Sequence, residues 1–121
     1  MRSATTTGEH AGFCAATVSL DHGTVALRLA GRLDGECAAR LHHALHAATV
    51  GARAVVVDLS EVTHLGSVGV SALLGAYTRG GGRVHLAGLT HPAVRQVATL
   101  LELERHFTVH PDVEGFVDSV R

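Results

Sequence analysis

The chain has no lysine, and aromatic residues make up only 3% of its 121 residues. Without lysine, covalent catalysis through a lysine Schiff base is excluded. The scarcity of aromatic rings argues against a protein that stacks nucleic-acid bases on exposed side chains. The formal net charge is −1 and the arginines are scattered, so we expect no basic surface that follows a phosphate backbone. A nucleic-acid partner is therefore not expected.

Cysteine is also scarce, since Cys14 and Cys37 are the only two and lie far apart in the sequence. This spacing excludes a zinc ribbon or a CxxC redox pair and predicts two buried, reduced thiols. No apolar run approaches the roughly 18 residues that a transmembrane helix needs. Residues 1–13 lack the hydrophobic core of an export signal. We expect a cytoplasmic protein without a membrane span.

The chain is rich in small aliphatic residues, and hydrophobic residues make up 46% of it. A chain of this length can bury one hydrophobic core without disulfides or metals, which indicates a single domain. Residues 1–12 are mostly small and polar, so they are predicted to form a flexible N-terminal lead. Residues 13–121 are predicted to form the domain itself.

The apolar spacing alternates between strand-like and helix-like along the chain. Residues 13–20 and 24–30 are predicted to form an antiparallel hairpin around Asp21-His22-Gly23. Further strands are predicted at 54–59, 83–87 and 107–109, and helices at 36–48, 67–78, 92–101 and after Asp112. Because strands and helices alternate after the hairpin, those strands should pair in parallel through crossovers. The sequence thus predicts an α/β fold with a mixed, mostly parallel sheet of about five strands and about four helices.

The segment from residue 54 to residue 82 carries the candidate site. Its strand should end near Asp58, and a loop over residues 60–69 should follow at the carboxyl edge of the sheet, where α/β proteins usually bind. Ser67 lies where the next helix should begin, near unpaired backbone N–H groups at the partly positive helix end. The simplest alternative for Ser67 is an ordinary helix cap.

Three motifs resemble the STAS domain family, in particular bacterial anti-sigma factor antagonists. They are Leu29-Ala30-Gly31-Arg32-Leu33-Asp34, Val55-Val56-Val57-Asp58-Leu59-Ser60 and Leu65-Gly66-Ser67-Val68-Gly69-Val70-Ser71-Ala72-Leu73-Leu74. The likeness extends over nearly the whole chain, from about Phe13 to Val120. It implies a STAS-type single domain that works by binding rather than by catalysis.

The resemblance also implies a function, partner switching, and its site residues. The unphosphorylated protein would bind an anti-sigma factor that is also a serine kinase, and so release a sigma factor. Phosphorylation at Ser67 would break that complex, and a serine phosphatase would restore it. No cofactor is implied. The expected partner-binding surface, called the Ser67 surface below, consists of Thr63, His64, Gly66, Ser67, Val68, Gly69, Val70, Ser71 and Leu74.

Gly66 departs from the family pattern, which usually has aspartate immediately before the phosphorylated serine. A carboxylate there can accept backbone N–H bonds and pair with a basic group of a partner, whereas glycine can do neither. A second hypothesis is therefore a STAS adaptor without phosphorylation, which acts as a constitutive protein-binding module or as a subunit of a larger assembly. A third is a small-ligand or metal-binding domain. A monomer and a weak dimer both stay open.

Other candidate sites have simpler explanations. His42 and His46 lie four residues apart on a predicted helix, but two imidazoles rarely make a metal site, so none is expected. Gly80-Gly81-Gly82 follows a helix and precedes a strand, the reverse of a phosphate-binding loop. Asp58, His64 and Ser67 contain the residue types of a hydrolase triad, but no G-x-S-x-G motif is present and an enzyme is not expected. His64 could instead adjust the local charge near neutral pH.

Overall fold

The computed structural model describes residues 4–10 and 12–120, which form one six-stranded sheet with the strands in sequence order. The strands are β1 (Ala4–His10), β2 (Phe13–Ser19), β3 (Thr24–Leu33), β4 (Ala54–Leu65), β5 (Val84–Ala87) and β6 (Thr108–His110). β2 runs antiparallel to both of its neighbours, β1 and β3, and β3 to β6 are parallel. The predicted hairpin and the mostly parallel sheet are confirmed.

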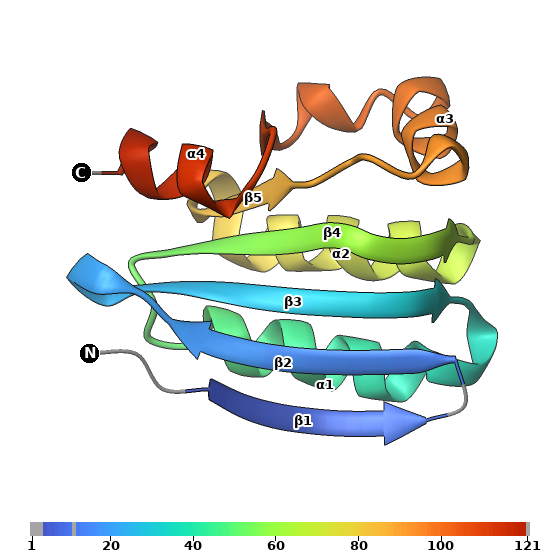
Figure 1. Ribbon diagram of the computed structural model, residues 1–121, viewed down its shortest axis with the longest axis horizontal. Coiled ribbons are helices and arrows are strands. Elements are labelled where there is room, and N and C mark those ends of the chain that lie inside the picture. Colours follow the sequence, from blue (N-terminus) through green and yellow to red (C-terminus); the bar gives the residue numbers. More distant parts are fainter. Residues whose placement is uncertain (1–3, 11, 121) are drawn as a thin grey trace.

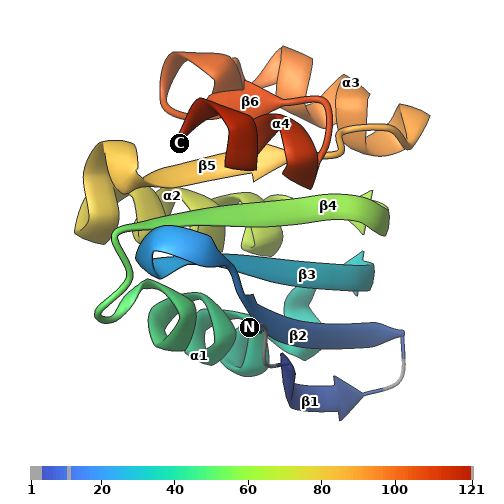
Figure 2. The ribbon, with the colours of Figure 1, turned by 60° about the vertical axis from the view of Figure 1, so that its left-hand side comes forward.

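Four α-helices cover the sheet, as predicted: α1 (Ala38–Thr49), α2 (Ser67–Gly80), α3 (Pro92–Leu100) and α4 (Val113–Ser119). Short 3-10 turns join them, namely η1 (Asp21–Gly23), η2 (Gly35–Cys37), η3 (Gly81–Arg83) and η4 (Leu103–Arg105). In Figure 1, α1 and α2 lie behind the sheet and α4 lies in front of it. Turning the molecule brings α1 and α4 into view on opposite sides of the strands (Figure 2). Within the described residues, none of these helices has the length and apolar character to cross a bilayer.

Two hydrophobic clusters lie on the two faces of the sheet. The larger packs α1, α2 and α3 on one face, with fully buried residues such as Leu41, Leu73 and Val94. The smaller packs Phe116 of α4 against Val56 of β4 and other small residues on the opposite face. The sheet therefore separates the packing of α4 from that of α1 and α2.

One strand lies where the sequence indicated a loose lead. Residues 4–10, inside the predicted segment 1–12, form β1 and pair with β2 in an antiparallel register that includes His10 opposite Phe13. An edge strand needs only one neighbour, so a polar segment with several threonines can join a sheet without a strong apolar pattern. The sheet thus has one strand more than the five expected.

A second correction concerns residues 60–69, which the sequence indicated as a loop. Residues 60–65 instead continue β4 and pair in parallel with the end of β3, for example Gly31 with Val62 and Leu33 with Leu65. Two register irregularities accommodate the extra residues of β4. Gly31 has a φ of +91°, and a Cβ on it would lie 1.9 Å from the carbonyl oxygen of Gly12. The two strands therefore end side by side, and only Gly66 separates β4 from α2.

Candidate functional site

Ser67 is the first residue of α2, at the edge where β3 and β4 both end. The N–H of Gly66 donates to the carbonyl of Leu33 at 3.0 Å, which ties the helix start to the end of β3. The carbonyl of Gly66 then accepts from the N–H of Val70 at 3.0 Å, so Gly66 is the N-cap residue. Ser67 is therefore the residue after the N-cap. The simplest alternative for Ser67, an ordinary helix cap, is wrong. Its hydroxyl lies at the partly positive end of α2, as predicted.

The nine residues of the Ser67 surface differ in exposure. Thr63, Ser67 and Ser71 are exposed, and His64, Gly66, Val68 and Leu74 are half-buried. Gly69 and Val70 are buried, so these two hold the surface in place rather than form part of it. The solvent-facing part is a patch of hydroxyls and small apolar groups around Ser67.

Gly69 explains how the start of α2 comes so close to the sheet. A Cβ at this position would lie 2.8 Å from Cδ1 of Leu65, 2.9 Å from Cβ of Leu33 and 3.0 Å from the Leu33 carbonyl oxygen. Leu33 and Leu65 are both buried, so neither has free space to move into. Glycine at 69 therefore lets α2 pack on the ends of β3 and β4, which fixes where Ser67 lies.

No side chain caps the first turn of α2, because the N-cap residue is glycine. The space above Gly66 is bounded by His64, whose Nε2 lies 3.3 Å from where a Cβ at residue 66 would stand. The unpaired backbone N–H groups of this first turn thus have an imidazole rather than a carboxylate beside them. An anion on Ser67 would lie next to these donors.

The end of β3 also belongs to this edge, although the site prediction did not include it. Arg32 is the register partner of His64, and its Nε lies 3.4 Å from Oδ2 of Asp34 in an exposed ion pair. Leu33 supplies both the carbonyl that holds Gly66 and the side chain that packs near Gly69. The Arg32-Leu33-Asp34 motif had marked the end of this strand in the sequence. Only the parallel pairing places it beside Ser67.

Both cysteines are free and Cys37 is buried, as expected, but Cys14 is only half-buried, so the prediction of two buried thiols is wrong for Cys14. The Cys37 thiol lies 3.2 Å from the carbonyl of Asp34 and can donate to it. Burial raises the pKa of the Cys37 thiol, so it stays protonated at neutral pH.

The hydrolase-like residues are not joined into a triad. The Oδ1 of Asp58 accepts from the N–H of Ser60 at 3.0 Å, and its Oδ2 lies 3.6 Å from Nε of Arg28. This bond is local, and Asp58 lies within β4 rather than near the end of the strand, where the sequence had indicated it. Among the described residues, no hydrogen bond links Asp58, His64 and Ser67. The same part of the chain contains no cluster of three metal-binding side chains, and His42 and His46 are both exposed.

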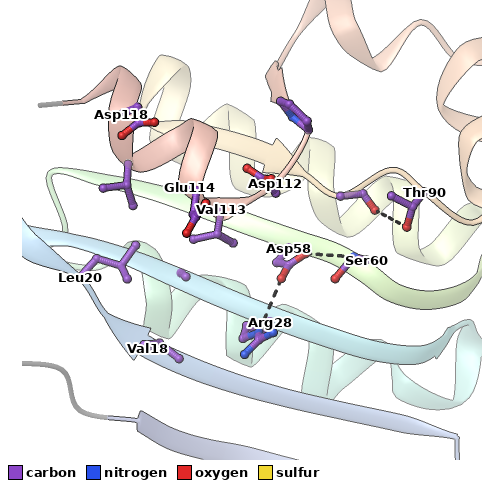
Figure 3. Close-up of a pocket in the computed structure, with 14 residues that line it drawn as sticks. Val18, Leu20, Arg28, Asp58, Ser60, Thr90, Asp112, Val113, Glu114 and Asp118 are labelled. Carbon is purple, nitrogen blue, oxygen red and sulfur yellow. Dashed lines mark hydrogen bonds and ion pairs between the residues drawn. The ribbon is translucent and has the colours of Figure 1, made fainter.

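A separate cleft of about 880 Å³ lies between α4 and the face of β2 and β3. Figure 3 shows the Arg28–Asp58 pair on its floor, and above it Val113 and Glu114 of α4 with the N-cap residue Asp112. None of the residues of the Ser67 surface lines this cleft. The Ser67 surface and the cleft are thus two different places on the domain.

The fold and this edge define a small α/β domain whose exposed serine begins a helix at the carboxyl ends of parallel strands. The family model described as "Mlab, STAS domain" matches residues 16–111. The chain belongs to the STAS domain family.

Solved structures agree with this assignment. An anti-sigma factor antagonist from Mycobacterium paratuberculosis is 28% identical with a TM-score of 0.82, and the match covers 90% of this chain and 94% of that one. The antagonist SpoIIAA in its unphosphorylated form is 23% identical with a TM-score of 0.65, covering 88% and 96%. The Bacillus cell fate determinant SpoIIAA in its phosphorylated form is 21% identical with a TM-score of 0.65, covering 88% and 99%. No curated protein matches the chain.

Proposed function

We propose that this protein is an anti-sigma factor antagonist that binds an anti-sigma factor through the Ser67 surface and loses that binding when Ser67 is phosphorylated. The observation that carries the proposal is the exposed hydroxyl of Ser67 on the first residue of α2. It occurs in a chain that resembles a mycobacterial anti-sigma factor antagonist over nearly its whole length.

The physical basis of the switch is charge. Transfer of the γ-phosphoryl group of ATP to Oγ of Ser67, with release of ADP and the hydroxyl proton, adds roughly −1.5 to −2 charge units at neutral pH. In the free protein, the uncapped backbone N–H groups at the start of α2 can stabilise the negative charge of the phosphate. A partner seated on half-buried Val68 and Leu74 would have to desolvate it. Phosphorylation should therefore weaken the complex more than it disturbs the domain.

The kinase is expected to be the anti-sigma factor itself, and a serine phosphatase would reverse the modification. The test is incubation with each candidate serine-kinase anti-sigma factor of the source organism, Mg²⁺ and ATP, followed by intact mass and peptide mapping. We expect one phosphoryl group, absent from Ser67→Ala and retained in Ser71→Ala, an exposed serine one turn later. Unmodified protein, or modification that survives Ser67→Ala, would refute the switch.

A second candidate function is a STAS adaptor that binds its partner without phosphorylation, and Gly66 favours it. Glycine leaves no carboxylate in the turn that a kinase would have to recognise. The two functions differ in the effect of Ser67→Glu on partner affinity, measured by calorimetry. The switch requires at least a tenfold loss of partner affinity, or about 1.4 kcal/mol of binding free energy. The adaptor predicts nearly unchanged affinity. Ala47→Glu is the matched control, because it adds the same charge at an exposed position in the last turn of α1, before β4 begins, whereas Ser67 follows the end of β4.

A further inference from the structure

Two histidines from different strands meet beneath α4, in a place that the proposed function does not use. His85 of β5 and His110 of β6 are 25 residues apart in sequence, yet Nδ1 of His85 lies 2.9 Å from Nε2 of His110. Phe116 of α4 contacts both rings edge-on, with centroid distances of 5.0 Å to His85 and 5.7 Å to His110. His110 is 9% exposed and Phe116 is fully buried. The pair therefore forms part of the floor on which α4 sits.

The geometry of the two rings requires a particular protonation state. Their planes differ by only 16° and their centroids are 5.1 Å apart, which places the two nitrogens between the rings, in line for a hydrogen bond. One nitrogen must then donate and the other accept. A first added proton leaves a charge on a ring that is buried (His110) or half-buried (His85), and a second leaves two N–H groups facing each other. The contact survives only while at least one ring is neutral.

Charged groups stand on each of the elements that surround the histidine pair. On α4, Asp112 caps the helix by accepting from Gly115, and Glu114 and Asp118 are exposed. Arg95 of α3 and Glu104 of η4 are exposed residues that line a recess shared with His110.

On the sheet side, the Asp58 carboxylate of β4 is held by Ser60 and Arg28, and Arg83 of η3 donates to the carbonyl of Ala52. None of these carboxylates offsets the pKa shift of either imidazole.

Both histidines have a pKa below the ordinary value for histidine. Burial, and then the neighbouring His110, lower the pKa of His85, and the carbonyl of Gly82 only partly opposes this. Burial lowers the pKa of His110 as well. A conformation in which α4 has left the sheet and the rings meet water would bind protons more readily than the closed one. Acid therefore favours the open conformation.

The packing of the core allows α4 to leave without unfolding the rest. Phe116 belongs to the smaller hydrophobic cluster with Ala26, Ala54, Val56 and Ala87, on the face of the sheet opposite α1 and α2. The larger cluster contains neither α4 nor the histidine pair. Opening α4 would thus expose one apolar face, while the face that supports α2 and Ser67 stays packed.

We propose that the His85–His110 pair is an acid-sensitive latch that holds α4 on the sheet, and that protonation of the pair releases α4 and uncovers the Phe116 face. This inference does not depend on what binds the Ser67 surface.

The test is native-state hydrogen exchange followed by NMR between pH 7.5 and pH 5, with protection factors corrected for the intrinsic pH dependence of exchange. Below the ordinary histidine pKa, protection of the α4 amides should fall by about tenfold per pH unit for each proton taken up on opening. The α1 and α2 amides should keep their protection. Constant α4 protection across this range, or an equal loss in α1 and α2, would overturn the latch.

Two double variants make the test specific. His85→Gln with His110→Gln keeps a neutral donor and acceptor but cannot titrate, so its α4 protection should not depend on pH. His42→Gln with His46→Gln removes two exposed histidines of α1 and should behave like the original protein. If the first variant fails to fold, ¹⁵N NMR of the imidazoles in the original protein decides. Both rings titrating at the ordinary histidine pKa would overturn the proposal, and depressed titration that coincides with loss of α4 protection would support it.

Discussion

Replacing either of two glycines in α2 by alanine should change stability in opposite directions. At Gly69, the new Cβ would lie within 3.0 Å of Leu65, Leu33 and the Leu33 carbonyl. At Gly75, six residues later in the same helix, it would meet only the flexible end of Arg79, at 3.6 Å from Nη1. Both substitutions replace glycine by alanine in the same helix. The difference between their effects on stability therefore measures the close approach of α2 to the sheet.

The magnitudes follow from two competing effects. Alanine in place of glycine stabilises a helix by up to about 1 kcal/mol, and at Gly75 nothing opposes this. At Gly69, overpacking costs roughly 1–3 kcal/mol, towards the upper end because Leu33 and Leu65 are buried and one contact is a backbone atom. We expect Gly69→Ala to lose about 1–2 kcal/mol and Gly75→Ala to gain about 0.5–1 kcal/mol.

Urea unfolding at equilibrium, with thermal melts as a second measurement, checks this prediction. A chain of this size should show a shift of roughly 3–5 °C in Tm for each kcal/mol, so the two variants should lie on opposite sides of the original protein. A Gly69→Ala variant as stable as Gly75→Ala would refute the close packing of α2 on Leu33 and Leu65. The account of how Ser67 is positioned would then fail as well.

The remaining predictions concern α4 and its surroundings. Asp112→Ala removes the carboxylate that accepts from Gly115 N–H at 2.8 Å and should cost about 1 kcal/mol in urea unfolding. Phe116→Ala leaves a cavity at a fully buried position and should cost about 3–5 kcal/mol by the same measurement. The folded-state pKa values of His85 and His110 are lowered, so the unfolded chain takes up protons first. The stability they contribute should be present above the ordinary histidine pKa and fall as the pH is lowered, and unchanged unfolding midpoints from pH 7 to pH 5.5 would contradict this.

Local patterns in the sequence were sufficient to predict most elements. In α2, which was predicted at residues 67–78, the apolar residues recur at helical spacing: Val70 and Leu73 are buried, and Leu74 and Tyr77 are half-buried against the same cluster. The last helix begins directly after Asp112, as predicted, and Asp112 is its N-cap residue. These features depend on neighbours within about four residues, which a pattern along the chain can register.

Other features depend on partners distant in sequence. The extension of β4 over residues 60–65 follows from its pairing with the end of β3, and no local alternation reveals it. The contact between His85 and His110 arises because β5 and β6 are neighbours in the sheet. The cap of α2 is a third case, since Gly66 is fixed by the carbonyl of Leu33, 33 positions earlier in the chain. In each case a strand pairing supplies the missing partner.

The sequence by itself determined the order of the helices and strands after β1, the parallel part of the sheet and the position of Ser67 at the start of a helix, because hydrophobic spacing and turn residues act over short stretches of chain. Only the tertiary structure decided which residues around Ser67 reach solvent, that Gly69 is a packing requirement, and that two histidines share a hydrogen bond beneath α4. Burial and contact are properties of pairs of segments, and the chain acquires them only when its strands lie side by side.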